Sequence, residues 1–439
     1  MQQQSAAGRT YRIQTLGCKA NQYDARRLAE AIEALGYREA PGDAPPDLLV
    51  VNTCTVTHTA DRKSRQLARR AVREHPGARV FVTGCYPTTF PEALAGIEGL
   101  AGVYGRSDWP AMMRVIAGAR DVPQGAQMAG DFGISSFSGR TRAFLKIQEG
   151  CDSFCTYCVV PHVRGRPRSR PLGEVEREAL ALAEAGFGEI VLTGIHLGLY
   201  GRDLAERADL ADAVRTVAGV RGVARVRLSS VEPMELTDRL LKAMAASPVV
   251  CPHVHLPLQS GDDCVLRRMG RPYTVRQFLG IVARARERLD NPAIATDVMV
   301  GFPGETGEEF ERTLRLCAEA AFSRVHVFPF SPRPGTPAAA MGDRVPPPVV
   351  RERVQRLERL ADLQARAWAE SFVGRTVNAL LEERRPDGRL TGYTRRYVRI
   401  SAPGPADLLG RAVDLLCTGA DGPALMGEVP ERSLDTCSR

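Results

Sequence analysis

The sequence predicts an α/β protein with an N-terminal open parallel sheet, a central partial (βα)6 barrel and a small C-terminal β-barrel. Short apolar runs alternate with amphipathic helical patterns from Tyr11 to about Gly118, and six more such units follow Phe144. After Val373 the pattern changes to short strands separated by turns. A chain of 439 residues is long enough for two or three domains. The expected divisions are an N-terminal domain 9–118, a Gly-, Ser- and Gln-rich linker 119–140, the barrel 141–372 and the C-terminal domain 373–432.

The charge balance favours a nucleic-acid partner. The formal net charge is +8, from 59 basic and 51 acidic residues. Almost all of the basic residues are arginine, since the lysines are only Lys19, Lys63, Lys146 and Lys242. Arginine presents a planar fork that matches phosphate, although a biased genome could produce the same skew.

The cysteine content and the hydropathy indicate a cytoplasmic protein. Eleven cysteines are too few for a disulfide scaffold in a chain of this length. The segment from Met1 to Thr10 lacks the apolar core of a signal peptide. No apolar run approaches the ~18–20 residues of a membrane span, so we expect no membrane partner.

Three N-terminal strands each run into a cysteine. The strands are expected at Tyr11–Leu16, Asp47–Asn52 and Arg79–Thr83, with helices at Asn21–Leu35, Thr59–Glu74 and Phe90–Ile97. The cysteines that follow the three strands are Cys18, Cys54 and Cys85. The carboxyl ends of parallel strands share one edge, so these thiols can converge. The pattern alone leaves a second metal cluster and buried structural thiols both open.

A second group of cysteines lies directly after the first barrel strand. Cys151, Cys155 and Cys158 form a C-x3-C-x2-C run in a polar loop. This spacing folds three thiolates around one iron–sulfur cluster and leaves one of its four corners free. A zinc knuckle that includes His162 is the alternative, and three unrelated buried thiols are a further one.

The central part predicts six barrel strands with polar loops at their carboxyl ends, where such barrels carry their sites. Residues His253 and His255 share a strand face, and we interpret them as satisfied core histidines. The strands are expected at Phe144–Gln148, Glu189–Thr193, Val226–Ser230, His253–Gln259, Ala293–Gly301 and Arg324–Ser331. The helices between them are expected at Leu172–Ala185, Leu236–Ala246, Val275–Leu289 and Glu308–Ala320.

The C-terminal part combines basic and aromatic residues. A proline run at 346–348 precedes a long charged helix, Val349–Phe372, and five short strands follow between Thr376 and Val429. Guanidinium groups can hold phosphates while tyrosine rings stack on unpaired bases, whereas the alternative is an ordinary solvated surface. The predicted RNA-binding residues are Arg384, Arg385, Tyr393, Arg395, Arg396 and Tyr397.

The cysteine run, with Tyr157 before its last cysteine, resembles the signature of the radical S-adenosylmethionine (SAM) superfamily. The order of the three parts resembles the methylthiotransferase branch, which combines an α/β domain, a radical SAM barrel and a TRAM domain. The resemblance extends from about Arg9 to Arg432. Its details are similar to the tRNA threonylcarbamoyladenosine subfamily in the segments Thr15–Gln22, Val51–Thr57, Ala60–Gln66 and Arg324–Ser331.

The resemblance implies two [4Fe–4S] clusters, SAM, and a methylthio group added at C2 of N6-threonylcarbamoyladenosine next to the tRNA anticodon. It implies that Cys151, Cys155 and Cys158 hold the SAM cluster and that Cys18, Cys54 and Cys85 hold an auxiliary cluster. The partners implied are the tRNA anticodon loop, a reducing electron donor and a sulfur donor. The implied SAM contacts are Tyr157, Gly194, Glu232, Gln259 and Asp297. The remaining cysteines, interpreted as structural, are Cys251, Cys264, Cys317, Cys417 and Cys437.

Four alternatives remain open at this point. The same chemistry could act on isopentenyladenosine in tRNA or on an aspartate of a ribosomal protein, and the basic C-terminal domain argues against the latter. A non-catalytic, metal-stabilised RNA-binding protein would not need polar loops at every strand end. An electron-transfer protein would have no use for an open iron corner and an RNA-binding domain.

Overall fold

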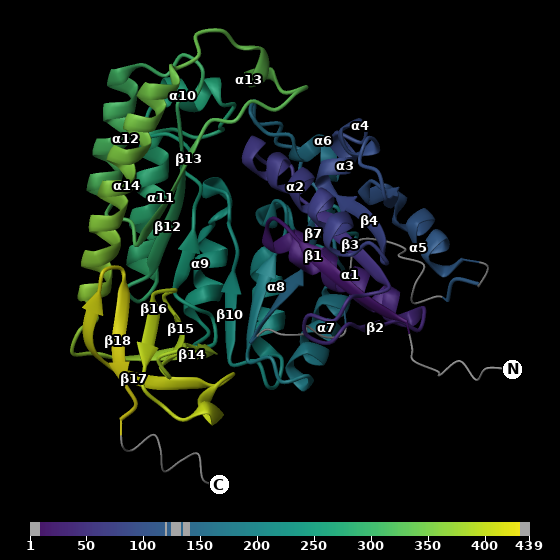
Figure 1. The fold of residues 1–439 in the computed structure, drawn as a ribbon. Helices are drawn as coiled ribbons and strands as arrows, with labels where there is room; N and C mark the ends of the chain where they lie inside the picture. Colours follow the sequence, from purple (N-terminus) through teal and green to yellow (C-terminus); the bar gives the residue numbers. More distant parts are fainter. Residues whose placement is uncertain (1–8, 119–120, 124–132, 135–140, 431–439) are drawn as a thin grey trace, which may run out of the picture.

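The N-terminal domain is a parallel sheet of five strands in the order β2-β1-β3-β4-β5 (Figure 1). The computed structural model describes residues 9–118, 121–123, 133–134 and 141–430. The central strand β3 (Leu48–Thr53) is buried along its whole length because helices cover both faces of the sheet. The other strands are β1 (Thr10–Thr15), β2 (Arg38–Glu39), β4 (Arg79–Gly84) and β5 (Leu100–Val103). The helices are α1 (Lys19–Ala34), α2 (His58–Glu74), α3 (Cys85–Thr89), α4 (Glu92–Ala95) and α5 (Trp109–Ala117).

Six parallel strands form the central barrel, which is open on one side. They pair as β10-β9-β6 and as β11-β12-β13, and parallel bridges from Val226 to Val250 and from Ser230 to His255 join the two groups. The sequence predicted these six strands and their order. The strands are β6 (Arg142–Lys146), β9 (Glu189–Thr193), β10 (Arg225–Leu228), β11 (His253–His255), β12 (Ala293–Val300) and β13 (Arg324–Pro329).

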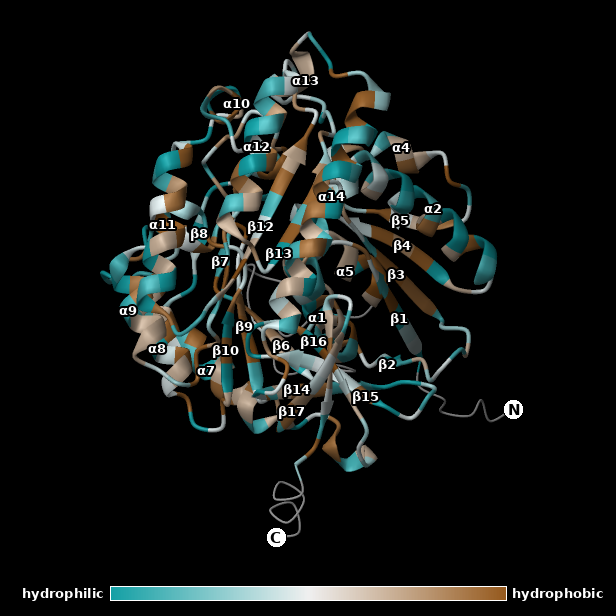
Figure 2. Ribbon diagram, turned by 90° about the vertical axis from the view of Figure 1, so that its left-hand side faces the viewer, coloured by the Kyte–Doolittle hydropathy of each residue, from teal (hydrophilic) through white to brown (hydrophobic). Residues whose placement is uncertain are grey.

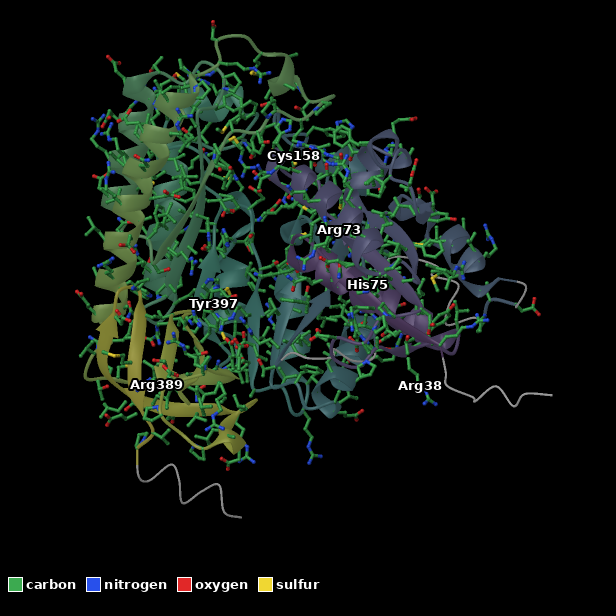
Figure 3. All side chains as sticks on the ribbon, in the orientation of Figure 1. Arg38, Arg73, His75, Cys158, Arg389 and Tyr397 are labelled. Atoms are coloured by element: carbon green, nitrogen blue, oxygen red, sulfur yellow. The ribbon has the colours of Figure 1, made fainter. Side chains whose placement is uncertain are left out.

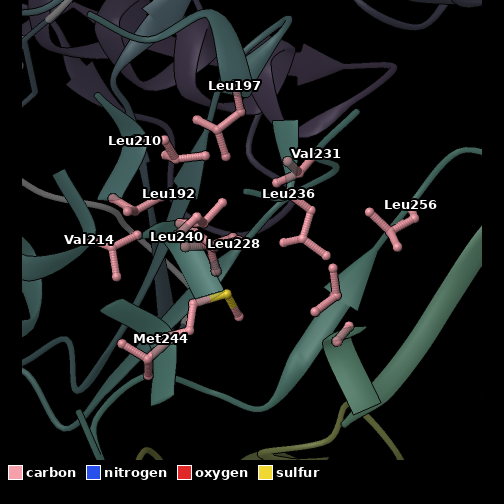
Figure 4. Close-up of a cluster of buried hydrophobic side chains, with 14 of the residues drawn as sticks. Leu192, Leu197, Leu210, Val214, Leu228, Val231, Leu236, Leu240, Met244 and Leu256 are labelled. Atoms are coloured by element: carbon pink, nitrogen blue, oxygen red, sulfur yellow. The ribbon is translucent and has the colours of Figure 1, made fainter. Parts of the chain in front are cut away.

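Amphipathic helices cover the outside of the barrel. Capping boxes begin α11 at Thr274 and α12 at Thr306, where each threonine accepts from the third helical N–H. Leucines of the barrel strands pack against leucines of the covering helices in one continuous core, part of which is drawn in Figure 4. The longer helices are α7 (Leu172–Glu184), α8 (Leu210–Gly219), α9 (Asp238–Ala245), α11 (Val275–Arg288), α12 (Gly307–Ala320) and α14 (Pro347–Glu370). Shorter elements are the pair β7 (Gln148–Glu149) and β8 (Arg168–Ser169), with α6 (Val160–Arg164), α10 (Asp263–Arg268) and α13 (Pro337–Ala340).

The C-terminal part is a closed five-stranded barrel in the order β14-β15-β16-β18-β17. It follows directly on α14, and its interior is a separate apolar core around Leu381, Ile400 and Leu415. In Figure 1 it lies below the central barrel, at the amino ends of the barrel strands. The strands are β14 (Thr376–Arg384), β15 (Leu390–Thr394), β16 (Arg399–Ala402), β17 (Ala412–Asp421) and β18 (Ala424–Glu428).

The fold class predicted from the sequence is confirmed, and the differences concern individual strands and helices. The sequence did not predict β2, β5, α5 or α8, and the helix expected at Phe90–Ile97 is the single turn of α4. Most of the expected linker lies outside the described residues, but Ile134 packs into the barrel core. Hydropathy colouring shows apolar strands sandwiched between helices with polar outer faces (Figure 2). Among the described helices, none has the length and apolar character that crossing a bilayer requires.

Candidate active site

The three N-terminal cysteines lie at the carboxyl edge of the sheet. Cys18 caps α1, Cys54 directly follows β3, and Cys85 begins α3 directly after β4. Close approach of these loops depends on Gly17, whose φ is +115° and where an added Cβ would lie 2.8 Å from Cys54 Cβ. The convergence that the parallel strands predicted is therefore present, although which group the thiols hold stays a prediction.

Asn21 holds this cysteine edge together. Its Nδ2 donates to the carbonyl oxygens of Leu16 at 2.7 Å and of Thr53 at 2.8 Å, which ties the loop after β1 to the end of β3. Its Oδ1 accepts from Arg164 Nη2 at 2.8 Å. The same Arg164 nitrogen lies 3.4 Å from Cys85 Sγ, so a residue of the barrel domain contacts a thiol of the N-terminal domain.

A buried group of charges surrounds Arg164 and joins the two domains. Arg164 Nη1 lies 3.0 Å from Asp24 and 3.1 Å from Glu149, and Lys146 Nζ lies 2.7 Å and 2.8 Å from the same two carboxylates. Burial alone would raise the pKa of Glu149, but Arg164 and its basic neighbours outweigh burial and hold that pKa at about 2. Arg106 likewise lowers the pKa of Asp24 against the effect of burial. Both carboxylates are therefore ionised.

The loop with the other three cysteines runs between β7 and α6, toward the carboxyl ends of the barrel strands (Cys158 in Figure 3). The backbone at Gly150 has a φ of +76°, and an added Cβ there would lie 2.0 Å from the carbonyl oxygen of Arg166. The Thr156 N–H donates to the carbonyl oxygen of Met269 at 3.0 Å. The loop is thus fixed from both sides, which holds its three thiols in place.

Side chains of the barrel contact two of these thiols. The Nδ1 atom of His196 lies 3.4 Å from Cys151 Sγ, and its Nε2 lies 2.6 Å from Glu235 Oε2. Burial opposes protonation of His196, but Cys151 and Glu235 together raise its pKa to about 10. On the other side, Arg271 Nη1 lies 3.3 Å from Cys155 Sγ.

Two of the predicted SAM contacts lie near Arg271. Its guanidinium forms an ion pair with Glu232, and Arg271 and Glu232 both contribute to the electrostatic environment of Tyr157. The Tyr157 ring packs against the apolar cluster that contains Met269 and Phe302. Tyr157 and Glu232 are therefore brought together beside Cys155.

Gly194 and Gln259 each lie in a constrained part of the barrel mouth. An added Cβ at Gly194 would lie 3.0 Å from both Cβ and Oε1 of Gln148, whose Oε1 accepts from the backbone of Ile195 and His196. Gln259 adopts a left-handed φ of +66°, and its buried Oε1 has no hydrogen-bond partner among the described residues. A buried unpaired amide oxygen is costly, so a polar ligand fits beside Gln259.

One large cavity, of about 1270 Å³, joins the three parts of the protein. Cys18 and Lys19 form its N-terminal wall, and Gly194 and Asp297 belong to its barrel wall. The C-terminal barrel closes it with aromatic and basic side chains, which include Tyr397 (Figure 3). Of the predicted SAM contacts, Tyr157, Glu232 and Gln259 lie outside its lining.

Histidines of the barrel also line this cavity. His255 Nε2 lies 3.0 Å from Asp297 Oδ2, and its ring stacks on that of His326 with centroids 5.4 Å apart. Burial lowers the pKa of His253 well below its usual value and also lowers that of His326. His253 Nδ1 has no hydrogen-bond partner among the described residues. The prediction that His253 and His255 lie in the core is therefore wrong, because this barrel is open and its inner wall borders a cavity, although His255 does have a partner in Asp297.

The spacing of the thiols bears on which metal group they fit. A single zinc ion binds each thiolate at about 2.3 Å, which places the sulfur atoms only about 3.8 Å from one another. Among the described residues, the groups whose ligand atoms all lie within 4.8 Å are His255–Asp297–His326 and Asp262–Cys264–Glu309. Neither cysteine trio is that compact, so neither has the spacing of a single zinc site, and which metal group the thiols hold stays a prediction. His162, the histidine of the alternative zinc knuckle, packs edge-on against the ring of Phe154.

The predicted RNA-binding residues lie in two different settings. Arg384 and Arg385 are exposed at the end of β14. Arg395 instead donates to the carbonyl oxygen of Val250 at 2.8 Å, and Arg396 pairs with Asp290 at 2.7 Å, so both contact the barrel domain. Tyr393 and Tyr397 stack with ring centroids 4.9 Å apart in the cavity wall. RNA contacts of these six residues stay a prediction.

Several residues of the site were not predicted as such from the sequence. Lys19, His196 and Glu235 stand beside predicted site residues, and for them proximity in the chain was the only signal. Arg164 and Arg271 lie in segments with no motif, and only the folded structure brings them to thiols that are distant in the sequence.

The chain matches known families over two of its three parts. Residues 145–317 match the Radical SAM superfamily, and residues 10–105 match the Uncharacterized protein family UPF0004. The chain is 39% identical to the threonylcarbamoyladenosine tRNA methylthiotransferase MtaB of Bacillus subtilis, over 95% of this chain and 96% of that protein. It is 36% identical to the Thermotoga maritima protein of the same name, over 89% of this chain and 91% of that protein. A tRNA-2-methylthio-N(6)-dimethylallyladenosine synthase of Pelotomaculum thermopropionicum is 34% identical to this chain, over 93% of this chain and 95% of that protein.

A solved structure shares the fold. The radical SAM methyltransferase TsrM of Kitasatospora setae superimposes with a TM-score of 0.55 over 75% of this chain and 77% of that chain, at 19% sequence identity. This likeness concerns the fold alone. The sequence relatives extend over all three parts and carry the assignment. The chain belongs to the radical SAM methylthiotransferase family.

Proposed function

We propose that this protein adds a methylthio group to C2 of N6-threonylcarbamoyladenosine at position 37 of tRNA. The observation that carries the proposal is the cavity, whose lining includes Cys18 of one cysteine trio together with Gly194 and Asp297 of the barrel that carries the other trio. The relatives named for this reaction cover nearly the whole chain and support the choice of substrate. As part of the proposal, the enzyme works in the cytoplasm, where a reducing electron donor and a sulfur donor serve it.

The two cysteine trios suit two [4Fe–4S] clusters. Cys151, Cys155 and Cys158 would hold the cluster that binds SAM, and Cys18, Cys54 and Cys85 would hold an auxiliary one. In both cases three thiolates leave one iron without a protein ligand. Burial raises the pKa of Cys54 and of Cys158 to about 12, so metal binding must displace a proton from each of these thiols.

The cofactors supply the radical and the sulfur chemistry that an unactivated C–H bond requires. The residues of the chain have the tasks of binding, orientation and exclusion of water. Gly194 allows SAM to approach the backbone at the end of β9, while Tyr157, Glu232, Gln259 and Asp297 are the proposed polar and aromatic contacts. The stacked tyrosines at 393 and 397 border the cavity on the side of the C-terminal barrel, where the base to be modified would enter.

Nucleoside analysis of tRNA tests the proposal. A host strain without its own methylthiotransferase genes would express the wild-type protein, Cys54→Ala or Cys155→Ala, and digested tRNA would be examined by mass spectrometry. We expect the methylthio derivative of threonylcarbamoyladenosine with the wild type only. Cys264→Ala, which changes an exposed cysteine outside both trios, is the matched control and should retain activity. Methylthio-isopentenyladenosine instead would overturn the substrate assignment.

Iron content separates the enzyme from a metal-stabilised binding protein. After anaerobic reconstitution we expect about eight irons per wild-type chain, because each cuboidal cluster contains four. Each trio variant should lose about half of this iron, and Cys264→Ala should lose none. Zinc in place of iron, without SAM cleavage under reduction, would refute the catalytic proposal.

A further inference from the structure

Lys19 is a basic residue in the cavity wall that has no counterion among the described residues. It directly follows Cys18, begins α1, and lines the cavity on the N-terminal side. Within the described part of the chain no hydrogen bond or ion pair involves its ammonium group. The same cavity is lined by Tyr397 and Arg399, so Lys19 shares this space with groups of the C-terminal barrel.

The other basic groups around Lys19 are neutral, paired with a carboxylate or, like Arg324 and Arg399 of the cavity lining, exposed. Burial keeps His253 and His326 in the neutral form at pH 7. Arg227 is bound to Glu189 at 2.8 Å, and Arg142 is bound to Glu382 at 2.6 Å. Among the described lysines and arginines of the cavity lining, Lys19 is therefore the one that is partly buried without a carboxylate partner. An anionic ligand that enters the cavity would offset the cost of that burial.

The proposed substrate carries such an anion in a suitable place. Threonylcarbamoyladenosine has a carboxylate on its N6 substituent, and C2 and the C6 atom that carries N6 flank N1 on the same edge of the purine ring. When C2 faces the sulfur centre at Cys18, the N6 substituent lies along the same wall of the cavity. Lys19, which follows Cys18 in the chain, belongs to this wall.

We infer that Lys19 binds the threonyl carboxylate and thereby selects threonylcarbamoyladenosine over adenosines with an uncharged N6 group. This inference rests on the proposed function and assigns a residue to its specificity. A dimethylallyl group in the same position would place hydrocarbon against an unpaired ammonium and supply no hydrogen bond. Selection thus combines two effects. The Lys19 ammonium attracts the carboxylate of threonylcarbamoyladenosine, and a dimethylallyl group would leave the same ammonium desolvated without a partner.

Binding of anticodon stem-loop RNAs tests the inference without turnover. Three RNAs of one sequence, with threonylcarbamoyladenosine, isopentenyladenosine or unmodified adenosine at position 37, would be titrated against the reconstituted protein. We expect Lys19→Met to weaken binding of the threonylcarbamoyl RNA about tenfold or more, because a hydrogen bond to a charged partner is removed. Binding of the two other RNAs should change less than twofold, and Lys19→Arg should keep most of the preference.

Two controls exclude indirect effects. Lys63→Met removes the same charge from an exposed site on α2 and should leave all three affinities unchanged. Iron content and the visible absorption spectrum of Lys19→Met should equal those of the wild type, which shows that Cys18 still holds its cluster. Loss of iron in Lys19→Met but not in Lys19→Arg would overturn the inference, since the lysine would then serve the cluster.

The outcomes distinguish the inference from the function on which it rests. If the wild type shows no preference among the three RNAs, the proposed substrate itself is wrong. If the wild type prefers the threonylcarbamoyl RNA and Lys19→Met keeps that preference, the substrate stands and the role of Lys19 is refuted.

Discussion

Arg164 Nη2 lies 3.4 Å from the sulfur of Cys85, in the buried contact between the N-terminal sheet and the barrel. An equivalent contact joins Arg271 Nη1 to Cys155 Sγ at 3.3 Å in the other cysteine group. Each trio thus has one thiol within reach of a buried guanidinium that a different segment provides. Hydrogen bonds and positive charge at a cluster sulfur stabilise the reduced, more negative state.

Arg164→Met should make the potential of the proposed auxiliary cluster more negative. Removal of a charge-assisted hydrogen bond worth about 1.5 kcal/mol corresponds to a shift on the order of 60 mV for a one-electron couple. Redox titration followed by electron paramagnetic resonance would measure the shift, and Arg164→Lys should show a smaller one. Arg166→Met, at an exposed position two residues further on, is the matched control. An unchanged potential in Arg164→Met would show that this contact does not tune the cluster.

The sequence predicted the parts of the site that depend on local pattern. The alternation of strands and helices predicted that Cys18, Cys54 and Cys85 share a sheet edge, because the geometry of a parallel sheet requires it. The contact of Arg164 with Cys85 was not predictable in this way. It depends on how two domains pack, and the 79 residues that separate these positions contain no pattern that encodes that packing.

The same distinction explains why the contacts of other side chains were not predicted. Arg395 and Arg396 belong to a basic and aromatic segment that predicts RNA contacts, yet both bind carbonyl oxygens or a carboxylate of the barrel domain. His253 and His255 have the strand alternation of core residues, but they face a cavity. Composition indicates which groups a segment offers, whereas the docking of domains decides what those groups contact.

Gly194→Ala should weaken SAM binding while the iron content of the protein stays unchanged. The added methyl group would lie 3.0 Å from Gln148, and overpacking of this kind costs about 1–3 kcal/mol, which is roughly a tenfold loss of affinity if it falls on the bound state. Gly188→Ala is the matched control, because it lies just before the same strand and its Cβ would meet only Ala224 at 3.9 Å. Equilibrium dialysis with SAM would give the affinities. Equal affinities for the two variants would contradict the placement of SAM beside Gly194.

Glu189 should make the junction of the two barrels sensitive to acid. It binds Arg227 at 2.8 Å and Arg225 at 3.2 Å, and these arginines donate to Arg395 and Tyr393 carbonyl oxygens of the C-terminal barrel. Burial would raise the pKa of Glu189, but Arg227 outweighs it and holds the pKa at about 2, below the usual 4.5. The carboxylate therefore contributes its full stabilisation above about pH 4.5 and loses it as the pH falls toward 2.

Glu189→Gln should remove that dependence. Because two buried guanidinium groups lose their partner, we expect a loss of about 3–5 kcal/mol at pH 7, and the difference from the wild type should shrink between pH 4.5 and pH 2. Thermal unfolding at a series of pH values would measure it. Glu184→Gln, at an exposed position in α7, should match the wild type throughout. A constant difference across this pH range would show that Glu189 is not the titrating group.

Arg384 and Arg385 are the predicted RNA contacts that remain free to reach a phosphate. Both are exposed at the end of β14, whereas Arg395 and Arg396 are bound to the barrel domain. Replacing both exposed arginines by alanine should weaken tRNA binding and reduce the slope of log affinity against log salt by about 0.7 to 0.9 for each phosphate that is no longer bound. Replacing Arg276 and Arg284 on α11 removes the same charge from the outside of the barrel and should leave the slope unchanged. If both double variants reduce the slope equally, net charge and not this edge of the C-terminal barrel determines the affinity for tRNA.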